Sequence, residues 1–246
     1  MPAAVVVALM LAATVGCMFL VDRMANDWAH RLPPWFENAF EQISNGGYSG
    51  WFLVPTGVIV LCLAAIISPA LPRLTQDVLT LLAVRFAFLF LAVGAPGLCG
   101  TIIKRLIGRA RPYMDVHGDP FTYMPFAWRS EYASLPSGHA TTVASMAMGI
   151  GALWPEARPV VWLYALVVMF ARVVVLAHHP SDVIAGALVG AVGAALVRRF
   201  FAARRLLFSP HDLAAYPGPS LARIRAALRQ AIIRLRKTEK LKYAPD

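Results

Sequence analysis

The chain has 246 residues, of which 59% are hydrophobic and 15% are charged, and its formal net charge is +10. This composition is too apolar for an ordinary soluble domain, and long apolar runs separated by short polar breaks are typical of helical proteins that cross a bilayer several times. We therefore expect an all-α integral membrane bundle of six transmembrane helices, since each span needs roughly 20 residues.

The first predicted span runs from about Ala3 to Val21. No Lys or Arg precedes it and no clear small-residue cleavage site follows, so we expect a retained helix instead of a secretory signal. The next segment, Asp22 to Tyr48, mixes polar residues with Trp and Phe, a pattern typical of a connection that lies along the membrane interface. A second span is predicted from about Trp51 to Leu71.

The third predicted span, about Val78 to Leu98, contains a charged residue, Arg85. Buried charge in a span is costly and can mark function. Because Arg85 is only about two turns from the near end, snorkelling to the interface is the simpler interpretation. The chain from Gly100 to Leu135 is basic and resembles a loop.

Three further spans complete the predicted bundle: about Ala140 to Leu153, Val160 to Ala177 and Asp182 to Val197. The fourth is short and rich in Ala, Gly, Ser and Thr. Small residues allow close helix contact, so we expect it to be central in the bundle. The cysteines Cys17, Cys62 and Cys99 each fall in an apolar run without metal or redox spacing, which favours packing or lipid contact.

The basic residues are distributed unevenly, because 12 of the 23 Lys and Arg residues lie at or beyond Arg198. The positive-inside rule places this end in the cytoplasm. With six spans both termini are cytoplasmic, and the connections around Arg105, Leu135 and His178 face outward, into the periplasm if the membrane is a bacterial inner membrane.

We divide the chain into a six-span domain, residues 1–199, and a basic cytoplasmic tail, residues 200–246. Residues 220–242 show apolar side chains at helical spacing, which predicts an amphipathic helix that contacts anionic lipids of the inner leaflet. Nucleic-acid binding is the rival interpretation, and the position of the charges directly after the last span disfavours it.

The segment Leu135-Pro136-Ser137-Gly138-His139 stands where a polar loop meets the fourth span. Ser137 is a candidate N-cap, and the amides of the first helical turn favour an anion. Gly138 allows close approach of a ligand, and His139 places a titratable ring beside it. This segment could hold a phosphate-like group and protonate its leaving group.

Two flanking segments add basic residues at fixed spacing. Lys104 is followed after six residues by Arg111-Pro112, and Arg172 is followed after five residues by His178, with Asp182 after three more. Together with Pro136-Ser137-Gly138-His139, this order resembles the three-part signature of the type 2 phosphatidic acid phosphatase (PAP2) superfamily. One position departs from it: Ala171 stands where the pattern has Ser, which removes a possible hydrogen bond near the phosphate.

The resemblance implies a role for each matching residue. His178 would be the nucleophile, Asp182 would orient it, and His139 would protonate the leaving oxygen. No metal or other cofactor is implied, since cationic side chains would stabilise the phosphoryl group. The expected phosphate-binding residues are Lys104, Arg111, Arg172, Ser137 and Gly138.

The function implied is metal-independent hydrolysis of a membrane lipid phosphate or diphosphate through a phosphohistidine. Candidate lipids are undecaprenyl diphosphate, phosphatidylglycerophosphate, phosphatidate and lipid A phosphates. A lipid phosphotransferase and a non-catalytic anionic-lipid transporter or scaffold are the alternatives. A vanadate-dependent haloperoxidase is disfavoured because those enzymes are soluble.

Other polar residues near the motifs receive structural interpretations. The aromatic loop Tyr113–Ser134 either covers the pocket or anchors at the interface. Arg105 and Arg109 are expected to flank a span at the headgroups, and His179 is expected to be a bystander. The remaining candidates are expected to be solvated or without a nameable partner: Asp115, Asp119, Glu131, His30, His117 and His211.

Overall fold

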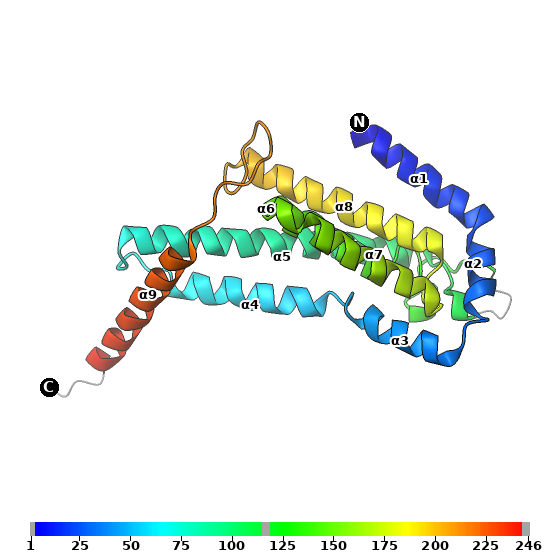
Figure 1. Ribbon diagram of the computed structural model, residues 1–246, viewed down its shortest axis with the longest axis horizontal. Helices are drawn as coiled ribbons and strands as arrows, with labels where there is room; N and C mark the ends of the chain where they lie inside the picture. Colours follow the sequence, from blue (N-terminus) through cyan, green and yellow to red (C-terminus); the bar gives the residue numbers. More distant parts are fainter. Residues whose placement is uncertain (1–2, 115–118, 243–246) are drawn as a thin grey trace. The chain divides into compact units, whose positions relative to one another are not determined.

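The computed structural model describes residues 3–114 and 119–242, without the side chains of residues 3, 221 and 235–242. These ranges contain nine α-helices and three short 3-10 turns but no β-strand, so the all-α prediction is confirmed (Figure 1). The helices are α1 Ala3–Leu20, α2 Asp22–Ala29, α3 Pro34–Asn45, α4 Gly50–Ile66, α5 Arg73–Ile107, α6 Gly138–Leu153, α7 Arg158–Val174, α8 Pro180–Ala203 and α9 Leu221–Lys242.

Four helical segments of the described chain are long and apolar enough to cross a membrane: Pro34–Ile66, Arg73–Ile107, Pro155–Val174 and Pro180–Ala203. The pair α1 and α2, bent by 58°, would make a fifth if it is one span. Helix α6 has 16 residues and falls short of a full span by length. Membrane embedding therefore has structural support, whereas the count of six spans stays a prediction.

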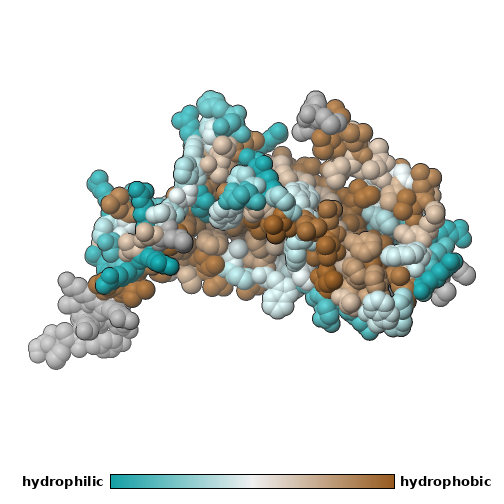
Figure 2. Space-filling view, viewed as in Figure 1, coloured by the Kyte–Doolittle hydropathy of each residue, from teal (hydrophilic) through white to brown (hydrophobic). Residues whose placement is uncertain are grey.

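The surface of the helices agrees with this assignment. Large apolar side chains are exposed on α4 and α7, and brown apolar atoms cover much of the visible surface in Figure 2. On α7, Val160, Leu163 and Leu166 are more than half exposed. Cys62 and Cys99 are free and exposed on apolar helices, as expected for lipid contact.

The chain divides into two compact units by its internal contacts. The first comprises Met1–Phe52 and Leu91–Val197, and the second comprises Leu53–Phe90 and Arg198–Asp246. Helices α4, α5 and α8 contribute residues to both units. The predicted boundary between residues 199 and 200 separates membrane spans from a tail and does not divide the chain by internal contacts, so it stays a prediction.

Helix α6 is the centre of the first unit's core. Ala140, Val143, Ala144 and Ala147 are buried and pack with residues of α7 and α8. Most of α6 is buried, as its small residues predict.

Glycines on α8 explain how closely the helices of the first unit approach. A Cβ at Gly186 would lie 2.4 Å from the Ser137 backbone oxygen, and one at Gly190 would lie 2.4 Å from the Thr141 backbone oxygen. The hydroxyl of Ser145 donates across the same contact to the Gly190 carbonyl at 3.2 Å. The absence of side chains here lets α8 hold the N-terminal end of α6 directly.

The second unit has a separate core between α4, α5 and α9. Leu63, Leu71 and Leu79 pack against Ala227 and Ala231 of α9. The helix predicted in the tail is present, and its small residues form the buried face. Leu228 and Ile232, which belong to the predicted apolar stripe, are exposed.

Arg85 lies inside this second unit, so the snorkelling interpretation is wrong. Its side chain is buried, and one terminal nitrogen donates to the Tyr216 carbonyl oxygen at 2.5 Å. A Cβ at Gly218 would lie 3.1 Å from the guanidinium carbon. The segment that follows α8 therefore covers the Arg85 guanidinium and supplies its polar partner. The sequence had predicted that the membrane interface would solvate this charge.

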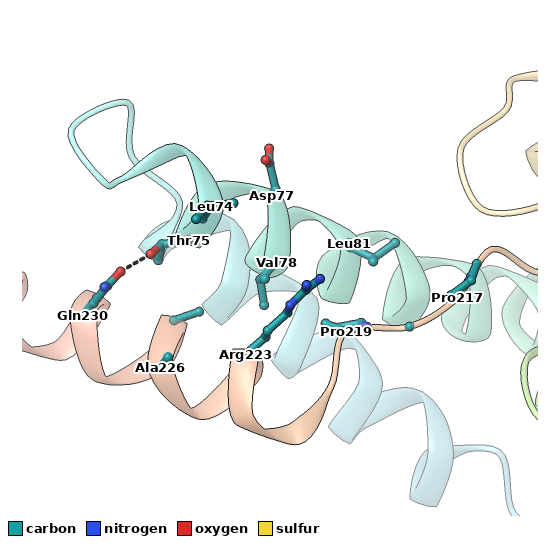
Figure 3. A pocket seen from close by; sticks show the side chains of 12 residues that line it. Leu74, Thr75, Asp77, Val78, Leu81, Pro217, Pro219, Arg223, Ala226 and Gln230 are labelled. Carbon is teal, nitrogen blue, oxygen red and sulfur yellow. Dashed lines mark hydrogen bonds between the residues drawn. The ribbon is translucent and has the colours of Figure 1, made fainter.

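A pocket of about 520 Å³ lies between the start of α5 and α9 (Figure 3). The side chain of Arg223 extends from α9 toward α5 beside Val78, and Thr75 donates to the Gln230 amide oxygen at one end. The pocket lining thus combines an apolar wall with one cation, Arg223, and one carboxylate, Asp77.

Candidate active site

The end of α5 places the first motif. The helix continues through Lys104 to Ile107, so the prediction that the chain is loop-like from Gly100 was wrong. It stops at Gly108, which has φ +64°, and a Cβ there would lie 1.8 Å from the Met124 carbonyl oxygen. Only glycine fits this turn, which directs the following residues along a new path.

Backbone hydrogen bonds then fix the segment after Gly108. Arg109 pairs with Tyr123 in an isolated antiparallel bridge, and its carbonyl accepts from the Ser134 amide at 3.1 Å. The Arg111 amide donates to the Glu131 carbonyl at 2.9 Å. The first motif and the segment leading to the second are therefore held together by their main chains.

The second motif forms the predicted helix start. The Ser137 hydroxyl accepts from the Ala140 amide at 3.4 Å, which confirms Ser137 as the N-cap of α6. The Ser137 amide donates to the Asp182 carbonyl at 2.9 Å, which joins the second motif to the third. A Cβ at Gly138 would lie 3.0 Å from the ammonium nitrogen of Lys104. A cation, a helix N-terminus and the third motif therefore meet, as an anion site needs.

His178 lies between α7 and α8 and is buried together with Asp182. Its Nδ1 is 3.8 Å from Asp182 Oδ2 and 3.4 Å from the hydroxyl oxygen of Ser134. That hydroxyl donates to Asp182 Oδ2 at 2.5 Å. When Nδ1 carries the proton, its N–H can donate a hydrogen bond to the Ser134 hydroxyl oxygen. Ser134 then links the ring to the Asp182 carboxylate, to which its own hydroxyl donates. Nε2 is then the ring nitrogen that carries the lone pair.

The two motif histidines share one electrostatic environment. Burial lowers the pKa of His178 to about 3 against the opposing effect of Asp182, and the charges of Arg111 and Arg172 act with burial. Burial also lowers the pKa of His139, which precedes the predicted span, to about 3, and Arg172, Lys104 and Arg111 act in the same direction. Both rings are thus neutral at pH 7, and both are close to Arg111 and Arg172.

Arg172 offers a donor that fits an added anion. It lies in the last turn of α7, where one terminal nitrogen contacts the Ser44 hydroxyl of α3. Among the residues described, its buried Nε has no hydrogen-bond partner. Arg111 differs, since its Nε donates to the Ser130 carbonyl at 3.0 Å. The Ala171 side chain that replaces the family Ser is buried in α7.

Two residues central to this region were not identified from the sequence. Arg109 was assigned to the headgroups, but its side chain is fully buried and bridges Asp182 and Asp22. Asp22 was placed in an interfacial connection, whereas it accepts hydrogen bonds inside the first unit. No sequence signal links these positions, because Asp22 and Arg109 are 87 residues apart.

His179 also differs from its prediction as a bystander. It is buried, and its Nδ1 lies 2.9 Å from the side-chain amide nitrogen of Asn26. Its backbone amide donates to Asp182 Oδ2 at 2.9 Å. His30 and His211 are exposed, and His117 and Asp115 lie outside the described residues. Within the described ranges, no group of three or more His, Cys, Asp and Glu residues is placed to hold a metal ion.

The aromatic loop carries exposed rings beside α5. Trp128 stacks near the Arg105 guanidinium at 5.9 Å, and Arg105 donates to the Trp128 carbonyl at 2.6 Å, which gives it a partner other than the headgroups. A groove of about 300 Å³ lies between this loop and α5, lined by Thr101, Ile102, Arg105, Leu106, Phe126 and Trp128.

Comparison with known proteins gives consistent matches. The PAP2 superfamily model matches residues 85–206. A lipid A 1-phosphatase of Rhizobium johnstonii is 41% identical over 122 residues, and one of Rhizobium etli is 38% identical over 122 residues. Each match covers 50% of this chain, and it covers 50% and 53% of the two relatives. The chain therefore matches about half the length of these relatives.

One solved structure resembles the fold. It is described as the first transmembrane PAP2 type phosphatidylglycerolphosphate phosphatase from Bacillus subtilis. The TM-score is 0.55 at 21% identity, and the alignment covers 81% of this chain and 96% of that chain. This similarity supports a membrane-embedded helical fold. The match of the family model across all three motifs shows that the chain belongs to the PAP2 superfamily.

Proposed function

We propose that this protein hydrolyses a membrane lipid phosphate through a phosphohistidine on His178. The observation that carries the proposal is the environment of that ring: it is buried and neutral, and Ser134 and Asp182 lie on its Nδ1 side. A neutral imidazole oriented through Nδ1 is a competent nucleophile at Nε2. The cations near both histidines supply the charge that a phosphoryl group needs.

The proposed reaction has two chemical steps, formation and hydrolysis of the phosphohistidine. Nε2 of His178 would bond to phosphorus while the bond to the lipid oxygen breaks, and His139 would give that oxygen its proton. A water molecule would then transfer a proton to His139 and attack phosphorus, which releases phosphate and restores His178. Lys104, Arg111, Arg172 and the Ser137–Gly138 amides would hold the equatorial oxygens.

The lipid nature of the substrate rests on the groove beside α5. Its exposed Ile102, Leu106 and Phe126 form an apolar surface on and beside the helix that also carries Lys104. A hydrocarbon chain could lie in this groove beside the helix that supplies a phosphate-binding cation. We take lipid A carrying a 1-phosphate as the first substrate to test, because both relatives are named for it. Phosphatidylglycerophosphate, phosphatidate and undecaprenyl diphosphate complete the panel.

The experiment uses purified full-length protein in detergent with chelator present. Wild type should release phosphate from at least one of these lipids, and His178→Ala should lower kcat by about 10³-fold or more. His139→Ala should lower it by about 10²–10⁴-fold with the lipid. With an aryl phosphate, whose leaving group needs no proton, His139→Ala should accumulate an acid-labile phosphoenzyme.

The control is His211→Ala, since His211 is exposed in the second unit. The His211→Ala protein should release phosphate with the same kcat as wild type. Phosphate release that survives His178→Ala would contradict the nucleophile assignment. Lipid binding without turnover in wild type would favour the transporter or scaffold alternative, and phosphate transfer to an added acceptor lipid would favour the phosphotransferase.

We also propose that the tail contacts anionic lipids of the cytoplasmic leaflet. Leu228, Ile232 and Ile233 are exposed on α9, and Arg223 reaches into the pocket beside α5 (Figure 3). An apolar stripe with adjacent cations is what an interfacial helix needs. Native mass spectrometry should show fewer retained anionic lipids for Arg223→Gln than for wild type. Equal retention would contradict the role of Arg223.

A further inference from the structure

Arg109 joins two carboxylates that come from distant parts of the chain. One terminal nitrogen lies 2.6 Å from Asp182 Oδ1, and the other lies 2.8 Å from Asp22 Oδ2. All three side chains have no solvent exposure. Ser181 completes the contact, because its hydroxyl accepts from Arg109 at 2.7 Å and donates to Asp22 at 2.5 Å. We call Asp22, Arg109, Ser181 and Asp182 the charge network.

Both carboxylates are surrounded by donors, which fits their ionised forms. Asp22 accepts from Arg109, from the Ser181 hydroxyl and from the Ser181 amide at 2.9 Å. Asp182 accepts from Arg109, Ser134 and the His179 amide. A protonated carboxyl would lose one of these bonds, since its O–H needs an acceptor.

The charge network therefore carries a net charge of −1 in the resting protein. Among the described residues, the titratable groups that face it are Cys17, whose sulfur is 3.8 Å from Asp22 Oδ1, together with Lys104, Tyr123, His178 and His179. Burial lowers the pKa of His179, and it raises the pKa of Tyr123, so both are neutral near pH 7. Without Asp22, Arg109 would cancel the charge of Asp182.

We propose that Asp22 is a positioning residue that acts through Arg109 and keeps Asp182 effective toward His178. The inference rests on the proposed function. When His178 bonds to phosphorus, its ring becomes cationic, and the negative charge of the network balances that new charge. Asp22 thereby stabilises the phosphohistidine without touching substrate. A buried ion pair is by itself weak evidence for a purely structural role, although removal of one partner destabilises the fold by leaving the other charge uncompensated.

The test compares phosphohistidine formation in full-length variants that are folded in detergent. Asp22→Asn keeps the side-chain shape and removes the charge, so the network becomes neutral. We expect phosphorylation and kcat to fall at least tenfold with little change in KM. The acid limb of the pH profile of kcat should move to lower pH, because a more positive environment lowers the pKa of His178. Asp27→Asn is the matched control, since Asp27 is exposed on the same helix.

A double variant separates charge from packing. Asp22→Asn combined with Arg109→Gln removes one charge of each sign, so the network keeps −1. The double variant should form the phosphohistidine faster than Asp22→Asn alone. If Asp22→Asn does not fold, the double variant is compared with wild type directly, and its rate of phosphorylation should be within about a hundredfold of the wild-type rate. Equal rates for wild type and Asp22→Asn, or a double variant slower than the single one, would overturn the inference. Failure of wild type to phosphorylate would instead overturn the proposed function.

Discussion

At the residue scale, His139 lacks the proton that a general acid must deliver. Burial and the charges of Arg172, Lys104 and Arg111 lower its pKa to about 3, so the free protein holds the ring neutral at pH 7. A dianionic phosphate would offset those cations and favour the charged ring. Substrate binding is therefore expected to raise the pKa of His139 and to arm the acid only when the phosphate is present.

This predicts proton uptake on binding of a phosphate mimic. Vanadate binding at pH 6–7 should take up as much as one proton, because His139 is neutral before binding and its pKa rises afterwards. Calorimetry in buffers of different ionisation enthalpy measures the number. His139→Gln should bind vanadate with less uptake. Identical uptake in wild type and variant would show that another group receives the proton.

The site residues that could be identified from the sequence are those that belong to motifs with fixed local spacing. The three motifs, the N-cap Ser137 and Gly138 follow from short stretches, and the structure brings them close. Arg109 and Asp22 could not be found in this way, since their pairing depends on tertiary contact. Arg85 was misassigned for the same reason, because its partner Tyr216 is 131 residues away.

At the element scale, the contact of α6 with α8 sets the geometry of the site. We predict that Gly190→Ala lowers stability by about 1–3 kcal/mol, because its methyl would overlap the Thr141 backbone oxygen. The N-terminal end of α6 would shift from the start of α8, and kcat should fall as well. Thermal unfolding in detergent and phosphate release measure the two effects.

Gly97→Ala on α5 provides the matched control. Nothing lies within 4 Å of a Cβ at this position, so a methyl is accommodated. Alanine also has the higher helix propensity. This variant should equal or exceed wild type in stability. A Gly190→Ala protein as stable and active as wild type would show that α6 and α8 can separate without cost.

The elements were predictable to the extent that apolar runs define them. Each predicted span lies largely within a helix, and α6 is central as its composition suggests. The end of α5 was not predictable, since Lys104 and Arg105 break the apolar pattern while the helix continues to Ile107. The buried face of α9 was also missed, because it is made by the small Ala227 and Ala231.

At the scale of the whole molecule, charge placement argues for one orientation in the membrane. Of the 23 Lys and Arg residues, 12 lie at or beyond Arg198. Lys104 and Arg111 oppose this bias, but the proposed phosphate site accounts for them. The positive-inside rule therefore predicts a cytoplasmic tail and motif connections on the outer face.

Cysteine labelling tests this orientation. In a background lacking Cys17, Cys62 and Cys99, Asp119→Cys should react with an impermeant maleimide on intact cells with the outer membrane made permeable. His211→Cys should react only after the inner membrane is opened, since the tail is expected inside. Both positions are exposed on the protein, so burial cannot explain a difference between them.

The two sites together decide between orientation and span count. Labelling of both residues from outside would mean that an even number of spans separates Asp119 from His211, in place of the three that the sequence predicts. It would also contradict the cytoplasmic tail. The reverse pattern would place the motif connections inside and restrict the substrate to the cytoplasmic leaflet. The expected pattern would leave the motif histidines facing lipids of the outer leaflet, where a phosphate can reach them by lateral diffusion.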